Sequence, residues 1–177
     1  SSLGGSYLEA ITSLPKQCHP MKLFSVALLL VAGYEGVKGY EEDCLNVIAK
    51  IPEITARVIN HHAGWTQEFE SNPELGYMEN FVHMLGVPNK DEEKLFQVLE
   101  LFNVLHYDHG GGNLSTFTGK TIASGAEDIY GALSGAMSAL AGPLHGKANQ
   151  DTLDFLTRIV EKYGENPSED EVEAFIR

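Results

Sequence analysis

Two short segments of the sequence combine histidine with glycine and small polar residues, and each lies at a break between apolar stretches. They are residues 106–115 and 140–150, and their candidate site residues are His106, His109, Asn113, Ser115 and His145. Imidazole, amide and hydroxyl groups can all hydrogen-bond to a small anionic substrate. Asn113 and Ser115 could equally cap the helix that follows them. Because breaks between helices are where a helical protein directs polar groups into a cleft, we expect both segments to line one site.

The histidines of the first segment, His106 and His109, are three residues apart near the expected end of a helix. Three roles are open on the residues alone. His106 can be a core histidine with His109 as a helix cap, or neutral imidazoles can bind a substrate. Alternatively, both can join His145 in a zinc-like ligand set. The glycines that follow could also cradle a phosphate, although a single glycine run is more often a flexible break.

His145 is expected at the start of a helix, after a break at Gly142 and Pro143. The positive end of the helix dipole disfavours a second positive charge, so this imidazole should stay neutral and donate a hydrogen bond. A neutral donor suits stabilisation of an enolate oxygen formed from a carbonyl or a thioester. A histidine that only caps the helix is the alternative.

The composition is that of a globular domain with a sizeable core: 177 residues, of which 43% are hydrophobic. The formal net charge of -13 makes nucleic acids and anionic membrane surfaces poor partners. The longest apolar run, residues 23–33, is too short to span a bilayer. We therefore predict neither a nucleic-acid nor a membrane partner.

Cysteine and arginine are both scarce in this sequence. Cys18 and Cys44 lie in apolar surroundings without a Cys-x-x-Cys motif, which predicts buried free thiols and weakly favours a reducing compartment. The three arginines are Arg57, Arg158 and Arg177. A site for di- or tricarboxylates normally needs bidentate arginine, so this shortage has to be explained.

Hydrophobic periodicity is helical almost throughout, no strand pattern is convincing, and we predict an all-α fold with many closely packed helices. The first helix is expected to begin at His19-Pro20 and the second after Tyr40-Glu41. The third should begin at Met78 and end at Gly86. Pro52 should bend the second of these or mark a junction between two helices. A longer, central helix should be capped by Asn89, with Glu92 completing a capping box, and end at the His106 cluster.

The second half of the chain should contain three further helical regions. Residues 116–141 are rich in Ala, Gly and Ser, which predicts a close approach between helices. A helix should follow His145 and run to about Tyr163. A capping box at 168–171 opens a last helix, whose apolar face, Val172, Phe175 and Ile176, has no visible partner.

The two polar segments strongly resemble motifs of the citrate synthase family, of the long type found in mitochondria and some bacteria. Residues 106–115 are similar to His-x-Asp-His-x-Gly-Gly-Asn-x-Ser, and residues 139–150 to Gly-Leu-Ala-Gly-Pro-Leu-His-Gly-x-Ala-Asn-Gln. Residues 15–21 and 42–52 resemble two further family segments. Gly110 stands where Glu is common and Lys147 where Leu is common, and neither change should abolish the chemistry.

This resemblance implies condensation of acetyl-CoA with oxaloacetate to citrate and free CoA. In the family, the histidine matching His145 donates to the thioester carbonyl while an aspartate removes a methyl proton. The residues matching His109 and Asn113 bind substrate, and those matching Ser115 and His106 support the site. The resemblance implies no metal and no resident cofactor, because acetyl-CoA is a substrate.

The resemblance also implies a multi-helix citrate-synthase-like fold, with residues 1–146 in a large domain and residues 147–177 at the beginning of a small one. It places the aspartate base and several substrate arginines after the last residue. We therefore expect a middle section of a longer polypeptide, inactive alone, which accounts for the arginine shortage and the unpartnered last helix. The first residue, Ser1, is consistent with a start in mid-protein.

A homodimer is also implied, with the 19–33 helix and the Ala/Gly-rich helix as candidate interface elements. The expected location is the cytoplasm of a bacterium or, alternatively, the mitochondrial matrix. Three rival functions are open: a 2-methylcitrate synthase that uses propionyl-CoA, a metal-binding helical protein, and a non-catalytic dimerisation module.

Overall fold

The computed structural model of the chain describes residues 4–66, 69–88, 91–107, 110–146 and 148–177. Within these ranges the structure is helical and no strand is found, which confirms the predicted all-α fold. The chain divides into two compact units, Ser1–Ala139 and Leu140–Arg177. No helix in the described ranges is long and apolar enough to cross a bilayer.

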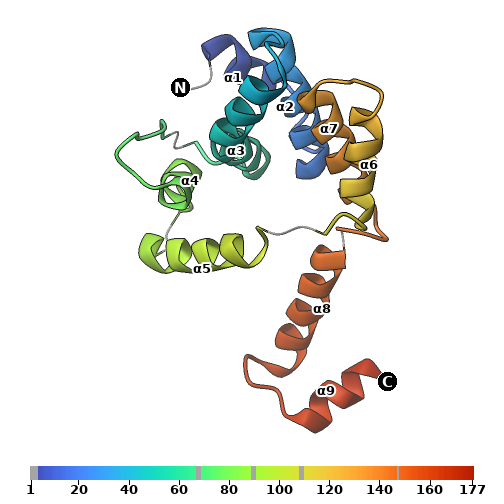
Figure 1. Ribbon diagram of the computed structural model, residues 1–177. Helices are drawn as coiled ribbons and strands as arrows, with labels where there is room; N and C mark the ends of the chain where they lie inside the picture. Colours follow the sequence, from blue (N-terminus) through green and yellow to red (C-terminus); the bar gives the residue numbers. More distant parts are fainter. Residues whose placement is uncertain (1–3, 67–68, 89–90, 108–109, 147) are drawn as a thin grey trace. The chain divides into compact units, whose positions relative to one another are not determined.

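The core of the first unit is built around α2 (Pro20–Glu35), which packs against α1 (Gly5–Thr12) and α3 (Tyr40–Ala63) (Figure 1). Buried apolar residues from these helices and from α7 (Ile129–Leu140) form one cluster, which includes Ile11, Leu28, Ile54 and Tyr130. The Tyr7 hydroxyl donates to the Ala27 carbonyl oxygen at 2.9 Å, so the phenol enters the core without an unpaired donor.

The beginning of α2 follows the sequence prediction. Pro20 is in the first turn, where its missing N–H costs no helical hydrogen bond, and the His19 ring accepts from the Met21 N–H at 3.2 Å. In α3, by contrast, Pro52 lies inside a single continuous helix, so the alternative of a junction between two helices was wrong. Tertiary packing compensates for the lost bond, since Pro52 and Ile54 are both buried.

The polypeptide continues through α4 (Tyr77–Leu85), which ends at Gly86 in the left-handed region (φ 52°, ψ 45°), as predicted. The next helix, α5 (Glu92–Leu105), is capped by Asp91, whose carboxylate accepts from the Lys94 N–H at 3.2 Å. The predicted cap, Asn89, lies outside the described residues. The placement of α5 as a central helix was wrong, because none of its residues is buried; Val98, Phe102 and Leu105 are 55–70% exposed.

The Ala/Gly-rich region forms α6 (Leu114–Ala123) and α7, and these helices approach closely, as predicted (Figure 1). A Cβ built on Gly119 would lie 3.2 Å from the Ala136 Cβ and 3.4 Å from the Ala132 carbonyl oxygen. One built on Gly135 would overlap the Ile122 side chain. Glycine at these positions lowers the helix propensity, but it allows the two helices to pack closely.

The second unit is formed by α8 (Ala148–Tyr163) and α9 (Glu169–Ile176). The capping box of α9 is present as predicted: the Ser168 hydroxyl accepts from the Glu171 N–H, and the Glu171 carboxylate accepts from the Ser168 N–H. The last helix is not entirely without a partner, however. The Phe175 ring packs edge-on against Phe155 at 5.6 Å between centroids, with Arg158 above it at 5.9 Å.

A polar cluster at the side of the core joins α2, α3 and α7. Lys50, which is only 4% exposed, pairs with the Glu35 carboxylate. The Asn46 amide donates to Glu35 Oε2 at 3.0 Å and to the Tyr130 hydroxyl at 2.9 Å. Burial raises the pKa of the Glu35 carboxyl, but hydrogen bonds from Lys50 and Asn46 and nearby positive charge outweigh it, so the pKa lies below its ordinary value.

This cluster gives a pH-dependent prediction. Because the Glu35 pKa is lowered on folding, the pair stabilises the fold above the ordinary glutamate pKa and loses that effect as pH falls through the lowered value. Replacing Lys50 by Met should lower the free energy of unfolding near pH 7 more than near pH 3, values that bracket the ordinary glutamate pKa of about 4.3. Urea unfolding at both pH values measures this, with Lys22→Met as an exposed control. A Lys50→Met deficit independent of pH would contradict the prediction.

The α6–α7 contact gives a second prediction. Gly119→Val should destabilise the first unit by about 1–3 kcal/mol, because the added methyl groups meet the Ala132 backbone and Ala136. Thermal and urea unfolding measure the change. The matched control is Gly33→Ala in α2, where nothing lies within 4 Å of the new Cβ; it should be neutral or stabilise by up to ~1 kcal/mol.

Candidate functional site

The first motif begins where α5 ends. His106 is the C-cap of this helix, and its ring stacks on Phe102 with 4.0 Å between ring centroids. The His106 Nδ1 lies 2.7 Å from the Phe102 carbonyl oxygen. Because a carbonyl oxygen only accepts, Nδ1 must carry the proton, and Nε2 of the neutral ring is the nitrogen that can accept from another group. His109 and Asp108 lie outside the described residues.

The end of the first motif is a helix cap. Asn113 precedes α6, and its Oδ1 accepts from the Ser115 N–H at 3.0 Å and from the Ser115 hydroxyl at 2.6 Å. The Ser115 side chain is therefore held in one orientation and buried, with 3% of its surface exposed. The sequence prediction of Asn113 as a cap is confirmed. The prediction of Ser115 as a second cap was incomplete, because the Ser115 hydroxyl donates a hydrogen bond to the side chain of Asn113, the residue that caps α6.

The second motif forms a tight corner between α7 and α8, within the second compact unit. The His145 N–H donates to the Gly142 carbonyl oxygen at 3.0 Å, and the Gly146 N–H reaches back to the Leu140 carbonyl oxygen at 2.9 Å. A Cβ on Gly146 would lie 2.5 Å from that oxygen, so only glycine fits this corner. His145 is half-buried and precedes the first residue of α8, Ala148, by one turn.

The two motifs thus lie in different compact units, the first in Ser1–Ala139 and the second in Leu140–Arg177. The structure joins Asn113 directly to Ser115. Their convergence with His145 on one substrate remains a prediction. No group of three or more His, Cys, Asp or Glu side chains suited to a metal ion occurs among the described residues, a set that does not include His109.

Several other polar side chains have structural roles. Asp128 accepts from the Gly131 N–H at 2.8 Å and caps the start of α7, as expected for an acid at a helix start. Cys18 and Cys44 are free thiols as predicted, but half-buried rather than fully buried. Arg158 and Arg177 bind side chains within the second unit, whereas Arg57 lines a pocket that the sequence did not predict.

The Asn113–Ser115 arrangement gives a third prediction. Asn113→Ala should destabilise the fold by about 1 kcal/mol, because the first turn of α6 loses its acceptor and the buried Ser115 hydroxyl loses its hydrogen bond to the Asn113 side chain. Equilibrium unfolding measures this. Asn113→Asp keeps an acceptor at the cap and is the matched control, expected within about 0.5 kcal/mol of the parent. Equal destabilisation by both changes would show that the cap contributes little.

Comparison with known proteins bears on both motifs at once. The family model described as "Citrate synthase, C-terminal domain" matches residues 2–177. A mitochondrial citrate synthase 4 of Arabidopsis thaliana is 36% identical over 182 residues, covering 95% of this chain and 38% of the relative. A peroxisomal citrate synthase of Saccharomyces cerevisiae is 30% identical, with 99% and 41% covered. The chain therefore spans about two fifths of the length of these relatives.

Solved structures of citrate synthases are also similar to this chain. The citrate synthase of Thermotoga maritima is 29% identical with a TM-score of 0.74, covering 98% of this chain and 44% of that one. A ternary complex of the Thermoplasma acidophilum citrate synthase with carboxymethyl coenzyme A and oxaloacetate has a TM-score of 0.81 at 23% identity, which supports the fold alone. The family model spans nearly the whole chain, and both polar motifs lie within it. The chain belongs to the citrate synthase family.

Proposed function

We propose that the full-length enzyme containing this chain condenses acetyl-CoA with oxaloacetate to give citrate and free CoA. The observation that carries the proposal is the family match over residues 2–177, which includes both polar motifs in order. The Thermoplasma acidophilum citrate synthase was solved with carboxymethyl coenzyme A and oxaloacetate, which supports a CoA derivative and oxaloacetate as the substrate classes. No resident cofactor or metal is required, since acetyl-CoA is consumed in the reaction.

The proposed catalytic residue is His145. It lies one turn ahead of α8, and its proposed role is to donate a hydrogen bond from the imidazole. Donation to the thioester oxygen stabilises the enolate that forms when a base removes a methyl proton of acetyl-CoA. The enolate carbon then attacks the keto carbon of oxaloacetate, and hydrolysis of the thioester releases CoA. The tight corner at Gly146 supports this role, because it holds the histidine backbone in one position.

The proposed substrate residues are His109 and Asn113, supported by Ser115 and His106. Asn113 has its Oδ1 engaged by Ser115, so its Nδ2 is the group with which it would donate to an oxaloacetate oxygen. His106 is fixed by Phe102 and presents Nε2 as an acceptor. We further propose that residues 1–146 belong to a large domain and residues 147–177 to the beginning of a small one.

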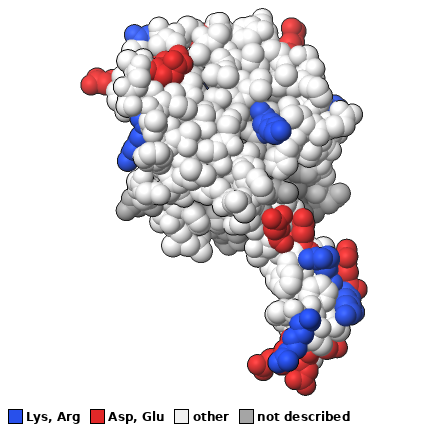
Figure 2. All heavy atoms as spheres, turned by 90° about the vertical axis from the view of Figure 1, so that its right-hand side faces the viewer, with Lys and Arg blue, Asp and Glu red and all other residues white. Residues whose placement is uncertain are grey.

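A homodimer is the assembly that we propose, with α2 and the Ala/Gly-rich helices α6 and α7 in the interface. Figure 2 views the first unit from the right-hand side of Figure 1, where α6 and α7 lie, and that face is largely uncharged. Charged side chains of both signs crowd α8 and α9 instead. Charge depletion is typical of the core of a protein interface. We propose the bacterial cytoplasm or the mitochondrial matrix as the location.

Substitution of His145 tests the proposed function. In the full-length enzyme, His145→Ala should lower kcat for CoA release by ~10²–10⁴, the usual contribution of a positioned acid or base. The control is His62→Ala, an exposed histidine bonded to the Lys16 carbonyl oxygen, which should leave kcat unchanged. Unchanged turnover in His145→Ala would remove this residue from the mechanism.

Three measurements on the full-length protein separate the rival functions. A higher kcat/KM with propionyl-CoA than with acetyl-CoA would assign a 2-methylcitrate synthase. Stoichiometric zinc in the purified protein, with loss of structure on chelation, would favour a metal-binding protein. Absence of any acyl-CoA turnover in a folded dimer would favour the non-catalytic module.

A further inference from the structure

A lysine side chain from α6 lies against the glycine turn of the first motif. The Asn113 N–H donates to the Gly110 carbonyl oxygen at 3.3 Å, which closes a turn with Gly111 and Gly112 at its centre. A Cβ built on Gly111 would lie 2.9 Å from Lys120 Nζ. The Lys120 side chain therefore extends back along α6, past the start of the helix, to the backbone of the turn.

The spacing along the chain brings this lysine close to a proposed substrate residue. Lys120 follows the helix cap Asn113 by seven residues, which is about two helical turns, so both lie on the same side of α6. Gly111, which Nζ approaches, is only two residues before Asn113, a length of chain that spans at most ~7 Å. The ammonium and the Asn113 amide therefore belong to one small region of the surface.

The Lys120 ammonium is a positive charge without a carboxylate beside it. None of the ion pairs found among the described residues involves Lys120. Lys120 is also the single charged residue between Gly110 and Ala126, in a chain with 25 acidic and 12 basic residues. An unpaired ammonium next to exposed, uncharged backbone creates a local positive potential that attracts an anion.

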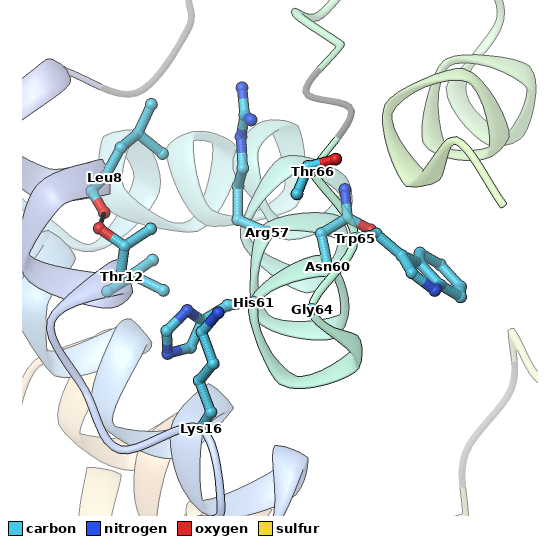
Figure 3. Close-up of a pocket in the computed structure, with 10 residues that line it drawn as sticks. Leu8, Thr12, Lys16, Arg57, Asn60, His61, Gly64, Trp65 and Thr66 are labelled. Atoms are coloured by element: carbon cyan, nitrogen blue, oxygen red, sulfur yellow. Dashed lines mark hydrogen bonds between the residues drawn. The ribbon is translucent and has the colours of Figure 1, made fainter. Parts of the chain in front are cut away.

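The substrate of the proposed reaction needs such a cation, because oxaloacetate carries two carboxylates. The arginines lie elsewhere in the described structure. Arg158 and Arg177 contact side chains of the second unit. Arg57 lines a pocket of about 330 Å³ between α1 and the second half of α3, shown in Figure 3, and no residue of either motif lines that pocket. Lys120 is therefore the cation that the described structure places at the first motif.

We propose that Lys120 binds a carboxylate of oxaloacetate, while Asn113 Nδ2 donates to another oxygen of the same molecule. This inference rests on the proposed function, and it adds a substrate-binding residue that lies outside both motifs. The exposed glycines of the turn leave room for the substrate, because they add no side chain between Lys120 and Asn113. Lysine acts here mainly as a charge, so its loss should raise the KM for oxaloacetate and leave kcat nearly unchanged.

Steady-state kinetics of the full-length enzyme test the proposal. Lys120→Gln should raise the KM for oxaloacetate by at least ~3-fold, the usual scale for one exposed charge contact. Its kcat and its KM for acetyl-CoA should stay within about 2-fold of the parent values. Lys120→Arg keeps the charge and should retain most of the affinity. The matched control is Lys16→Gln, an exposed lysine in the turn after α1, which should leave all three constants unchanged.

Two glycine variants test the position of the charge. Gly111→Ala should raise the KM for oxaloacetate, because the new methyl group displaces the ammonium without removing it. Gly112→Ala adds a methyl group where nothing lies within 4 Å, and its effect should be smaller. The proposal is wrong if Lys120→Gln leaves the KM for oxaloacetate unchanged, if only the KM for acetyl-CoA rises, or if Lys120→Arg loses as much affinity as Lys120→Gln.

Calorimetric titration of the full-length protein with oxaloacetate alone separates this inference from the proposed function. If the parent binds oxaloacetate, Lys120→Gln binds it at least ~3-fold more weakly and the parent releases no CoA, the condensation is wrong and the role of Lys120 stands. If the parent releases CoA but both proteins bind oxaloacetate equally well, the role of Lys120 is wrong and the condensation stands. A parent that does not bind oxaloacetate would overturn both.

Discussion

The burial of α2 against its neighbours is the constraint on which the first unit depends. Leu23, Ala27, Leu28 and Val31 form one side of this helix and pack with α1, α3 and α7. The Ser134 hydroxyl donates to the Ser25 carbonyl oxygen at 2.8 Å, so the α2–α7 contact also satisfies buried polar groups.

Much of the local structure could be predicted from the sequence, because it depends on short-range chemistry. Pro20 in a first turn, Gly86 after a helix, the Asn113 cap and the box at Ser168 each need only a few neighbouring residues. Close packing of α6 on α7 could also be predicted, since glycine in a helix costs stability that contact must offset. These features are set by backbone geometry, and a sequence displays them directly.

Features that depend on what covers a helix were harder to predict. The apolar residues of α5 predict burial but do not identify the covering element, and in the described structure Val98, Phe102 and Leu105 stay exposed. Pro52 shows the opposite effect, because packing on both sides of it maintains one helix where propensity alone favours a break. The pocket between α1 and α3 has no sequence signal, since Lys16 meets Arg57 and Asn60 of α3 only through tertiary packing.

The candidate site combines these two kinds of information. Each motif fixes its own residues locally: Asn113 holds Ser115 through two hydrogen bonds, and Gly146 admits the Leu140 carbonyl oxygen that closes the His145 corner. In the proposed reaction neither motif would orient the substrates alone, because an enolate oxygen and a keto acid need donors from two directions. For the proposed reaction, each motif would therefore contribute donors whose local geometry is fixed before substrate binds, and preorganised donors are what stabilisation of a developing negative charge requires.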